Sequence, residues 1–372
     1  MKTKMKTKII SILALVGLMF NANAESPVWG TYKVECPANS DTYIGITTTR
    51  APVFTGKVQS VQSGTTNIVA QGEPNWSANQ FVYVAGSQTN HYYLKFTSGE
   101  LEGAWYDIKS NGAYFAEIEI GSAELAKVKA NDSFEVIPHW TLQTLFPNGD
   151  GFVKATSKST TGITKIYKYT KYENGEIIYP TGSNNAPLVE YYYRERSPYF
   201  AWMSDSSTIA TYDVIEPNAV LIIRQPSKAP ASVSINGIVP MCKTSLLVSN
   251  LSATEDTDNY FAVPSMSDMI VSDFNESLID SGVFVSQTGK SNNGIDNLYV
   301  YDNKSELGTA LNRAPSHVYF HKNRSGVSNW QESGTITNNA PLESVFTALI
   351  LRKRCTGEIS TQRITFKPKY VK

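Results

Sequence analysis

The stretch GITKIYKY (residues 162–169) occurs again in altered form as GIDNLYVY (294–301), and the second copy follows the first by 294 − 162 = 132 positions. Each copy ends in a tyrosine, one intervening residue and a second tyrosine. A spacing of two places both rings on one face of a β-strand. The pair therefore predicts a β-strand that the chain builds twice.

Other segments repeat in the same order on either side of this pair. VLIIR (220–224) is matched by ALILR (348–352), and Trp202 is matched by Trp330, so the offset drifts by only a few residues. A preserved order with a nearly constant offset is typical of a duplicated block. We therefore expect two copies of one β arrangement.

The front of the block gives a looser match. GTYKVECPANSDTYIGIT (30–47) resembles NGIVPMCKTSLLVSN (236–250), which places Cys36 near Cys242. Residues 55–136 have no counterpart in the second copy. We interpret this stretch as a separate β module that is inserted in the first copy.

Short segments rich in aromatic and β-branched residues follow one another along the chain, and Gly, Asn, Asp and Ser fill the gaps between them. This pattern is typical of β-sandwiches and β-barrels. The predicted fold is all-β, with two duplicated β-sandwich or barrel-like domains and a small β module inserted in the first. The expected parts are a signal peptide (1–24), a first β repeat domain (25–54 plus 137–228), an inserted small β-barrel-like module (55–136) and a second β repeat domain (229–372).

The first residues have the three parts of a secretory signal peptide. Four lysines precede an apolar run from Ile9 to Phe20, and Ala22-Asn23-Ala24 supplies the small residues that a signal peptidase reads. The apolar run is short for a membrane span, which needs about 20 residues, so a retained anchor is the weaker interpretation. We expect an exported protein, located in the periplasm, at the cell surface or outside the cell, with no integral membrane segment after signal removal.

The charge of the mature chain limits its partners. Removing residues 1–24 takes away four lysines and no acidic residue, which leaves 33 − 4 = 29 basic against 33 acidic residues. A weakly acidic chain without basic runs lacks the electrostatic footprint of nucleic-acid binding. We expect cell-surface glycans or other envelope proteins as partners, and no nucleic acid.

No known catalytic motif stands in the sequence: G-x-S-x-G, H-E-x-x-H, a P-loop and G-x-G-x-x-G are all missing. The three cysteines, Cys36, Cys242 and Cys355, form no C-x-x-C pair. Export permits a disulfide, and the sequence leaves open whether any two of them form one. The sequence therefore predicts no catalytic residue and no cofactor.

Two groups of side chains offer weak alternatives for a metal. His317 and His321 stand four apart in a predicted strand, and the acidic residues of ATEDTDNY (253–260) and Asp150 in NGDG (148–151) could hold calcium through oxygen ligands. Neither acidic segment has a full twelve-residue calcium loop, so solvated turns are the favoured interpretation. We expect no metal site.

The tyrosines of the repeated strand admit two interpretations. A position that stays aromatic in both copies is what a shared core needs, whereas a row of exposed rings would be a platform for sugars. We favour core packing, which requires Tyr167 or Tyr169 to be largely buried. Tyrosine also suits half-wet contact surfaces, and the candidate ligand-contact aromatics are Tyr172, Tyr191, Tyr193, Trp202 and Trp330.

Several segments together resemble a known family. They are SFEVIPHWTLQTLF (133–146), the turn TSGELEGAWYDI (97–108), the repeated Tyr-x-Tyr strand and the paired LIIR and LILR strands. Their order is similar to that of the secreted, internally duplicated all-β proteins found in many copies in verrucomicrobial and related bacteria. The resemblance implies export and the duplicated architecture, and it transfers no activity, substrate or site residue.

Three functions are compatible with these observations. The favoured one is a secreted, non-catalytic structural or surface-interaction protein. The second is a carbohydrate-binding or adhesive module that uses exposed tyrosine and tryptophan side chains. The third is a hydrolase whose carboxylates meet only in the fold, since the separation of such a pair is spatial.

Overall fold

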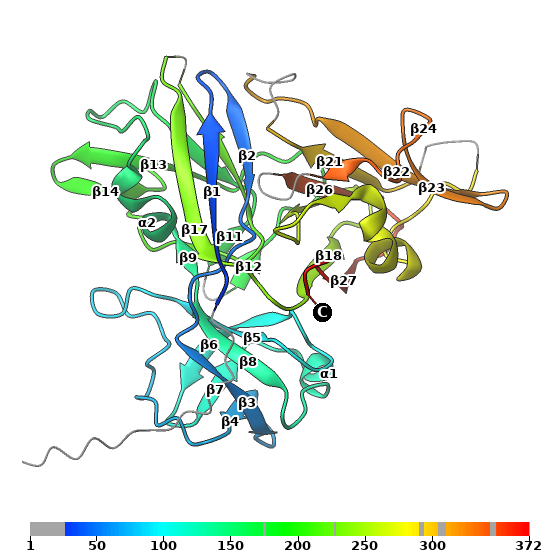
Figure 1. The fold of residues 1–372 in the computed structure, drawn as a ribbon. Helices are drawn as coiled ribbons and strands as arrows, with labels where there is room; N and C mark the ends of the chain where they lie inside the picture. Colours follow the sequence, from blue (N-terminus) through cyan, green and yellow to red (C-terminus); the bar gives the residue numbers. More distant parts are fainter. Residues whose placement is uncertain are drawn as a thin grey trace, which may run out of the picture.

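The computed structural model of the protein describes residues 27–173, 176–226, 228–289, 294–303, 310–342 and 347–371, without the side chains of 172–177 (Figure 1). Most of its elements are β-strands, and the helical turns are at most six residues long. The prediction of an all-β fold is confirmed. No helix in these described ranges has the length and apolar character to cross a membrane.

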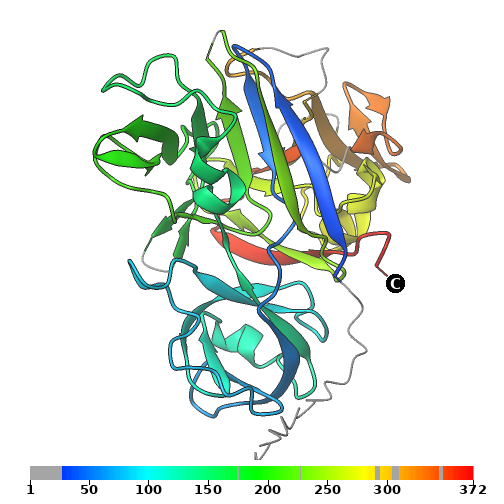
Figure 2. The same cartoon turned by 60° about the vertical axis from the view of Figure 1, so that its left-hand side comes forward.

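Five strands form the first sheet. Their order across the sheet is β14 (Tyr199–Met203), β13 (Val189–Arg196), β10 (Lys165–Lys168), β16 (Val220–Arg224) and β2 (Asp41–Gly45). A separate ribbon of two long antiparallel strands, β1 (Trp29–Cys36) and β17 (Ala231–Ile238), belongs to the same body, and Figure 2 brings it into view. Side chains from the ribbon and the sheet share one apolar core, so the pair makes a sandwich.

Six strands form the second sheet, which lies beside the first (Figure 1). Their order is β24 (Thr335–Ile336), β23 (Val327–Glu332), β22 (His317–Arg324), β21 (Asn297–Tyr301), β26 (Ala348–Lys353) and β19 (Thr257–Ala262). The ribbon on this side is β18 (Thr244–Asn250) with β27 (Ser360–Phe366), and it too shares a core with its sheet. Apart from β24, the strand order and the antiparallel pairing match those of the first sheet.

A closed barrel lies below the first sheet in Figure 1. Its strands, in order around the barrel, are β3 (Phe54–Val61), β4 (Asn67–Ala70), β7 (Phe115–Ile118), β6 (Trp105–Asn111), β5 (Tyr92–Phe96) and β8 (Ser133–Pro138). Alternate side chains fill the interior, and Phe134, Leu94 and Ile68 are fully buried there. The barrel occupies the stretch for which the sequence predicted an inserted barrel-like module.

Short elements complete the fold. The small strand pairs are β9 (Trp140–Thr141) with β15 (Val214–Ile215), β20 (Met269–Ile270) with β25 (Pro341–Leu342), and β11 (Lys171–Glu173) with β12 (Glu176–Ile178). The helical turns are α1 (Ser122–Leu125), α2 (Leu142–Leu145), η1 (Pro147–Gly149), η2 (Val271–Phe274) and η3 (Asn275–Asp280).

One expected boundary is wrong. Strand β17 pairs with β1 along its whole length, from Trp29 opposite Ile238 to Cys36 opposite Ala231. The second repeat therefore cannot begin at residue 229, because residues 231–238 complete the first sandwich. Cys36 ends β1, whereas Cys242 precedes β18, so the two cysteines are not equivalent. The loose match at the front of the block had aligned different strands, since most half-buried strands share the same alternation of apolar residues.

Candidate ligand pocket between the two sheets

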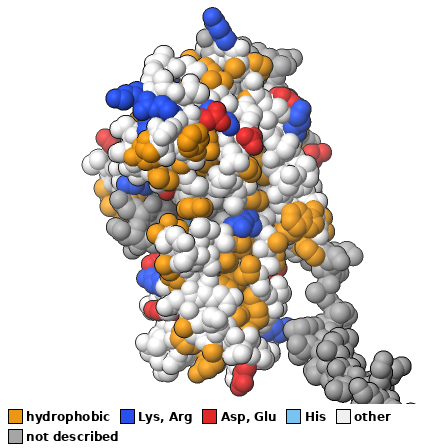
Figure 3. Space-filling view, turned by 90° about the vertical axis from the view of Figure 1, so that its left-hand side faces the viewer, with side chains coloured by type: hydrophobic (Ala, Val, Ile, Leu, Met, Phe, Trp, Pro, Cys, Tyr) orange, Lys and Arg blue, Asp and Glu red, His pale blue; other side chains and the backbone are white. Residues whose placement is uncertain are grey.

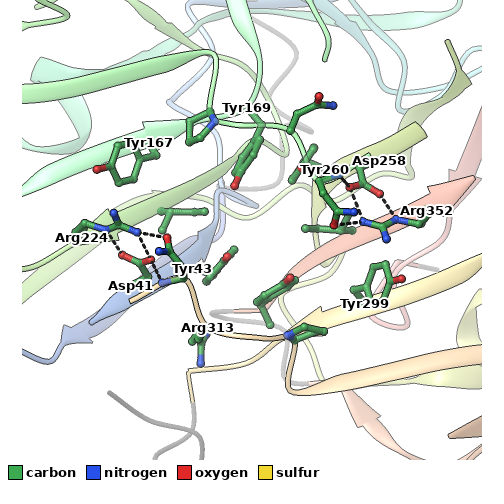
Figure 4. Close-up of a pocket in the computed structure, with 18 residues that line it drawn as sticks. Asp41, Tyr43, Tyr167, Tyr169, Arg224, Asp258, Tyr260, Tyr299, Arg313 and Arg352 are labelled. Atoms are coloured by element: carbon green, nitrogen blue, oxygen red, sulfur yellow. Dashed lines mark hydrogen bonds and ion pairs between the residues drawn. The ribbon is translucent and has the colours of Figure 1, made fainter. Parts of the chain in front are cut away.

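A pocket of about 500 Å³ opens where the first sheet faces the second (Figure 4). Strands β2, β10 and β16 supply one half of its wall, and β19, β21 and β26 supply the other. Its lining residues are Asp41, Tyr43, Tyr167, Tyr169, Asn184, Asn185, Pro187, Ile222, Arg224, Asp258, Tyr260, Tyr299, Tyr301, Asn312, Arg313, Pro315, Ile350 and Arg352. The volume falls in the range of small-molecule sites.

The alternation of the repeated strand decides which side chains reach the pocket. In β10, Ile166 and Lys168 are fully buried on the core side, while Tyr167, and Tyr169 directly after the strand, are half-buried on the pocket side. The Lys168 ammonium forms an ion pair with Glu216 and donates to the Val214 carbonyl, so this charge is satisfied within the core. The strand therefore turns Tyr167, and not Lys168, toward the second sheet.

Cross-strand register repeats the same rows of side chains in both sheets. In the first, Ile222 of β16 lies between Tyr167 of β10 and Tyr43 of β2. In the second, Ile350 of β26 lies between Tyr299 of β21 and Tyr260 of β19. Directly opposite residues in neighbouring strands have Cβ atoms about 5 Å apart. Each half of the wall is therefore a continuous band with an isoleucine between two tyrosines.

Two buried ion pairs flank the tyrosines, one in each sheet. Arg224 donates from Nε and Nη2 to the two carboxylate oxygens of Asp41 at 2.7 and 2.6 Å. Arg352 donates in the same way to Asp258 at 2.7 and 2.9 Å. Both aspartates are 4% exposed. The hydrogen bonds that Arg224 donates to Asp41 raise the pKa of Arg224, so this two-pronged pair stabilises the charged guanidinium.

A loop from each half of the molecule contacts the ion pair of the other half. Asn184 follows β12, yet its backbone N–H donates to Asp258 of the second sheet at 2.9 Å, and its side-chain oxygen accepts from Arg352 at 2.8 Å. Asn312 follows β21 and makes the same two contacts with Asp41 and Arg224 of the first sheet, at 2.7 and 2.6 Å. The two loops therefore cross over, and each ion pair is completed by the opposite half of the molecule.

The backbone of both crossing loops has the same unusual conformation. Asn184 has φ +54° and Asn312 has φ +53°. This left-handed region is open chiefly to glycine and asparagine. An asparagine at this position therefore supplies both the turn and the side-chain oxygen that meets the arginine.

Four of the tyrosines stack in pairs across the boundary between the sheets. Tyr43 of the first sheet lies 4.1 Å from Tyr301 of the second, centre to centre, with 20° between the ring planes. Tyr169 of the first lies 4.1 Å from Tyr260 of the second, with 10° between the planes. Such pairs contribute about 0.5–1.5 kcal/mol beyond their buried area. The tyrosines thus join the two sheets and line the pocket at once.

The remaining two tyrosines lie against the arginines. The guanidinium carbon of Arg224 is 5.0 Å from the Tyr167 ring centre, and that of Arg352 is 4.8 Å from the Tyr299 ring centre. Figure 4 shows the two ion pairs on opposite sides of the pocket, with Tyr43 between them. The pocket is therefore aromatic in its middle and charged at both ends.

The tyrosine hydroxyl groups stay protonated at neutral pH. Burial, and after it the neighbouring Tyr169, raises the pKa of Tyr301 to about 12. Burial likewise raises the pKa values of Tyr43, Tyr260 and Tyr169. A protonated phenol can both donate and accept a hydrogen bond, so the aromatic wall also offers polar contacts.

Four of the five aromatic residues predicted to contact a ligand lie elsewhere. Tyr191, Tyr193, Trp202 and Trp330 are between 0% and 7% exposed and belong to the sandwich cores. A ring enclosed on both faces cannot stack on a ligand, so the prediction is wrong for these four. The fifth, Tyr172, lies in β11, and its side chain is outside the described set.

The expectation for the repeated tyrosines is also corrected. Core packing required Tyr167 or Tyr169 to be largely buried, and both are half-buried at the pocket wall. The physical reason is that the face they share is covered by a second sheet and not by a closed core. Contact across such a boundary leaves a gap where the two curved surfaces separate.

The acidic residues considered as calcium ligands form ion pairs within the protein. Asp258 pairs with Arg352, and Asp256 pairs with Arg354 at 2.5 Å, so these acids of the 253–260 segment serve ion pairs. Within the described ranges no cluster of three or more His, Cys, Asp or Glu side chains could hold a metal ion. The three cysteines are free thiols.

Four of the pocket residues were not predicted from the sequence. DTYIG (41–45) and DNYFA (258–262) supply Asp41 and Tyr43, and Asp258 and Tyr260. The signal was present as a shared Asp-x-Tyr pattern that precedes each Tyr-x-Tyr strand. It was overlooked because residues 30–47 had been aligned with 236–250, one strand too early.

The outer surface shows no comparable candidate for a binding site on the face drawn in Figure 3. The face in Figure 3 carries apolar side chains scattered among polar ones, with basic and acidic groups both present and no large area of one sign. Comparison with known proteins adds no relative: no family model, no curated protein and no solved structure matches the chain. The geometry of the pocket is therefore the main guide to function.

Proposed function

We propose that the chain is an exported, non-catalytic binding protein that holds a saccharide in the pocket between its two sheets. The observation that carries the proposal is the lining: six tyrosines, two arginine–aspartate pairs and two crossing asparagines face one space of about 500 Å³. This lining favours the carbohydrate-binding alternative over a purely structural role.

The chemistry of a sugar ring matches this lining. Its C–H bonds form apolar faces that pack on aromatic rings, and its hydroxyl groups need donors and acceptors around the rim. Tyrosine supplies both an apolar ring and a polar tip. The side-chain oxygens of Asn184 and Asn312, and the tyrosine hydroxyls, lie in the same wall.

The state of the carboxylates supports binding over hydrolysis at this site. Each oxygen of Asp41 and Asp258 already accepts a hydrogen bond from an arginine, and one oxygen of each also accepts from a crossing loop. Glycoside hydrolysis needs a free carboxylate and a second carboxyl group that carries a proton. Two carboxylates held by guanidinium groups are suited to shaping a pocket.

Duplication of one block accounts for the two-fold lining. Asp258 follows Asp41 by 258 − 41 = 217 positions, whereas Tyr299 follows Tyr167 by 299 − 167 = 132. The difference of 85 equals the number of residues from Phe54 to Pro138, 138 − 54 + 1 = 85, which hold the barrel. A duplicated block with a barrel inserted in its first copy would give these offsets.

Export is part of the proposal and has its own test. The mature chain should begin near Glu25, because Ala22-Asn23-Ala24 follows the apolar run. N-terminal sequencing of protein recovered outside the cytoplasm measures this directly. An intact Met1 on that material would refute export by a cleaved signal.

The binding proposal is tested on a glycan array with the mature protein. Tyr167→Ala combined with Tyr299→Ala removes one ring from each half of the pocket, and we expect binding to be lost while the melting temperature changes little, since both rings are half-buried. Tyr114→Ala is the matched control, because Tyr114 is 52% exposed and lies on the barrel. Retention of glycan binding by the double variant would refute the proposal.

A further inference from the structure

The two halves of the pocket differ at one position of the crossing loops. Because Asn184 and Asn312 occupy equivalent places, the residues that follow them, Asn185 and Arg313, are equivalent as well. Both line the pocket. The second loop therefore brings a positive charge to a place where the first loop brings a neutral amide.

Arg313 has few partners for a buried guanidinium. It is 7% exposed, and its Nη2 donates to the side-chain oxygen of Asn303 at 2.8 Å. Its guanidinium carbon lies 5.3 Å from the Tyr43 ring centre. Within the described part of the chain its Nε has no hydrogen-bond partner, and no carboxylate forms an ion pair with it.

The contrast with the other two arginines of the pocket is informative. Arg224 and Arg352 each hold an aspartate through two hydrogen bonds. The nearest acid in the wall, Asp41, already receives Arg224 and the loop of Asn312. Burial lowers the pKa of Arg313, and Asp302 and Asp41, which form no ion pair with it, oppose this shift only in part.

A buried guanidinium that no carboxylate of the described residues contacts directly is costly to keep. An anion that entered the pocket would remove that cost and would meet a donor fork suited to carboxylate and sulfate groups. The side chain is already held in place by Asn303 and Tyr43, so little ordering is left to complete on binding. These features describe a preformed site for one negative charge.

We propose that the saccharide is anionic, and that its carboxylate or sulfate group lies against Arg313. This inference rests on the proposed function. Because the rest of the lining is repeated in both halves, Arg313 also gives the pocket a direction, with the acidic end of the ligand on the Tyr43 side. The tyrosines and the two ion pairs then hold the neutral part of the sugar.

Calorimetric titration of the mature protein tests this with matched probes. The probes are tetragalacturonate with its methyl ester, and N-acetylgalactosamine 6-sulfate with unsulfated N-acetylgalactosamine. We expect wild type to bind an acidic form at least about 10-fold more tightly than its neutral partner, as a charge-assisted hydrogen bond contributes. The uronate and sulfate arms show which anionic group the site takes.

Two variants assign the preference to Arg313. Arg313→Asn copies the first loop, and we expect it to bind acidic and neutral forms equally and to lose the salt dependence of acidic binding. Arg196→Asn makes the same charge change on β13 outside the pocket and should keep the preference. Melting curves for both variants check that the fold is intact.

Each unfavourable result of this test would refute a different claim. Equal binding of acidic and neutral forms by wild type would overturn the inference and leave the saccharide pocket standing. An acidic preference that survives in Arg313→Asn would overturn the role of this side chain. Failure of every probe to bind, acidic or neutral, would count against the proposed function itself.

Discussion

At the residue scale, the buried carboxylates of the pocket depend on their arginine partners for stability. Asp41 accepts from Arg224 and from the backbone of Asn312, and it is 4% exposed. An isolated charge left in such a place is destabilising, because neither water nor a counter-ion can reach it. The ion pairs therefore link the shape of the pocket to the stability of the fold.

Asp41→Ala tests this link. Breaking a buried pair costs about 3–5 kcal/mol, and we expect a loss near the lower end because the Arg224 side chain is 26% exposed. Asp258→Ala should cost about as much, since Arg352 and Asn184 make equivalent contacts with it. Chemical denaturation measures both losses.

The control for these variants is Glu35→Ala. Glu35 pairs with Lys33 on the surface, where both side chains are about two-thirds exposed, and solvent screening leaves such a pair little effect on stability. An Asp41→Ala protein as stable as Glu35→Ala would show that the pocket ion pairs do not hold the sheets.

Acid sensitivity should arise at His91. Burial first, and then His139, lowers the pKa of His91 to about 4 from its usual value of 6.5. A base with a lowered folded-state pKa is protonated more readily in the unfolded chain, so unfolding is favoured as pH falls from about 6.5 toward 4. Below about 4 both states are protonated and the loss is complete.

His91→Phe isolates this contribution. A phenyl ring keeps a planar side chain against Tyr83, on which the imidazole stacks at 4.3 Å, and it removes the titration. Thermal unfolding between pH 4 and 7 should show a shallower loss of stability for the variant than for wild type. Parallel pH profiles would contradict the lowered pKa.

At the scale of elements, the two sheets meet closely at Gly45. An added Cβ there would lie 2.7 Å from the Ala262 Cβ and 3.0 Å from the Thr347 carbonyl oxygen. Both neighbours belong to the second half of the molecule and neither can swing away. Glycine is therefore required for β2 to approach β19, and this approach positions the tyrosine stacks.

Gly45→Ala should separate the strands and lower stability by about 1–3 kcal/mol, the usual cost of overpacking. Gly121→Ala is the matched control, because an added Cβ at Gly121 would meet no atom within 4 Å and its φ is −70°. The two denaturation midpoints are compared. A Gly45→Ala protein that is no less stable than the control would contradict the close contact.

The sequence predicted elements better than it predicted their faces. Tyr167 and Tyr169 were correctly placed on one face of a strand, because the alternation is local. Whether that face met a core or a pocket depended on β19 and β26, which lie far along the chain. Trp202 and Trp330 show the opposite error: large aromatic residues suggested contact with a ligand, and the hairpins folded them into the cores.

At the scale of the whole molecule, the barrel is structurally separate from the pocket. Its first and last strands pair with each other, with Phe54 opposite Val136, so the chain enters and leaves at one place. None of the described residues from 54 to 138 lines the pocket. Chain ends that lie close together make an inserted domain separable.

Residues 52–139 should therefore fold alone. The closed barrel has its own core, and we expect a cooperative thermal transition by circular dichroism. The contacts that would be lost include two partly exposed ion pairs, Glu124 with Arg363 of β27 at 2.6 Å and Glu102 with Lys243 at 3.3 Å. A fragment without a cooperative transition would show that the barrel depends on the sheets.

The crossing loops could not be predicted from the sequence. Asn184 and Asn312 lie in stretches of different length after their strands, and each completes an ion pair in the opposite sheet. Only the relative placement of the two sheets brings them together. The repeat indicated two similar halves, but the shared pocket is a property of their assembly.

The most direct test of the central claim is a crystal structure of the mature protein with a bound saccharide. We predict density for a sugar ring in the pocket, in contact with Tyr167 and Tyr299 and with both arginine–aspartate pairs intact. A saccharide bound on another surface, with the pocket empty, would contradict the account.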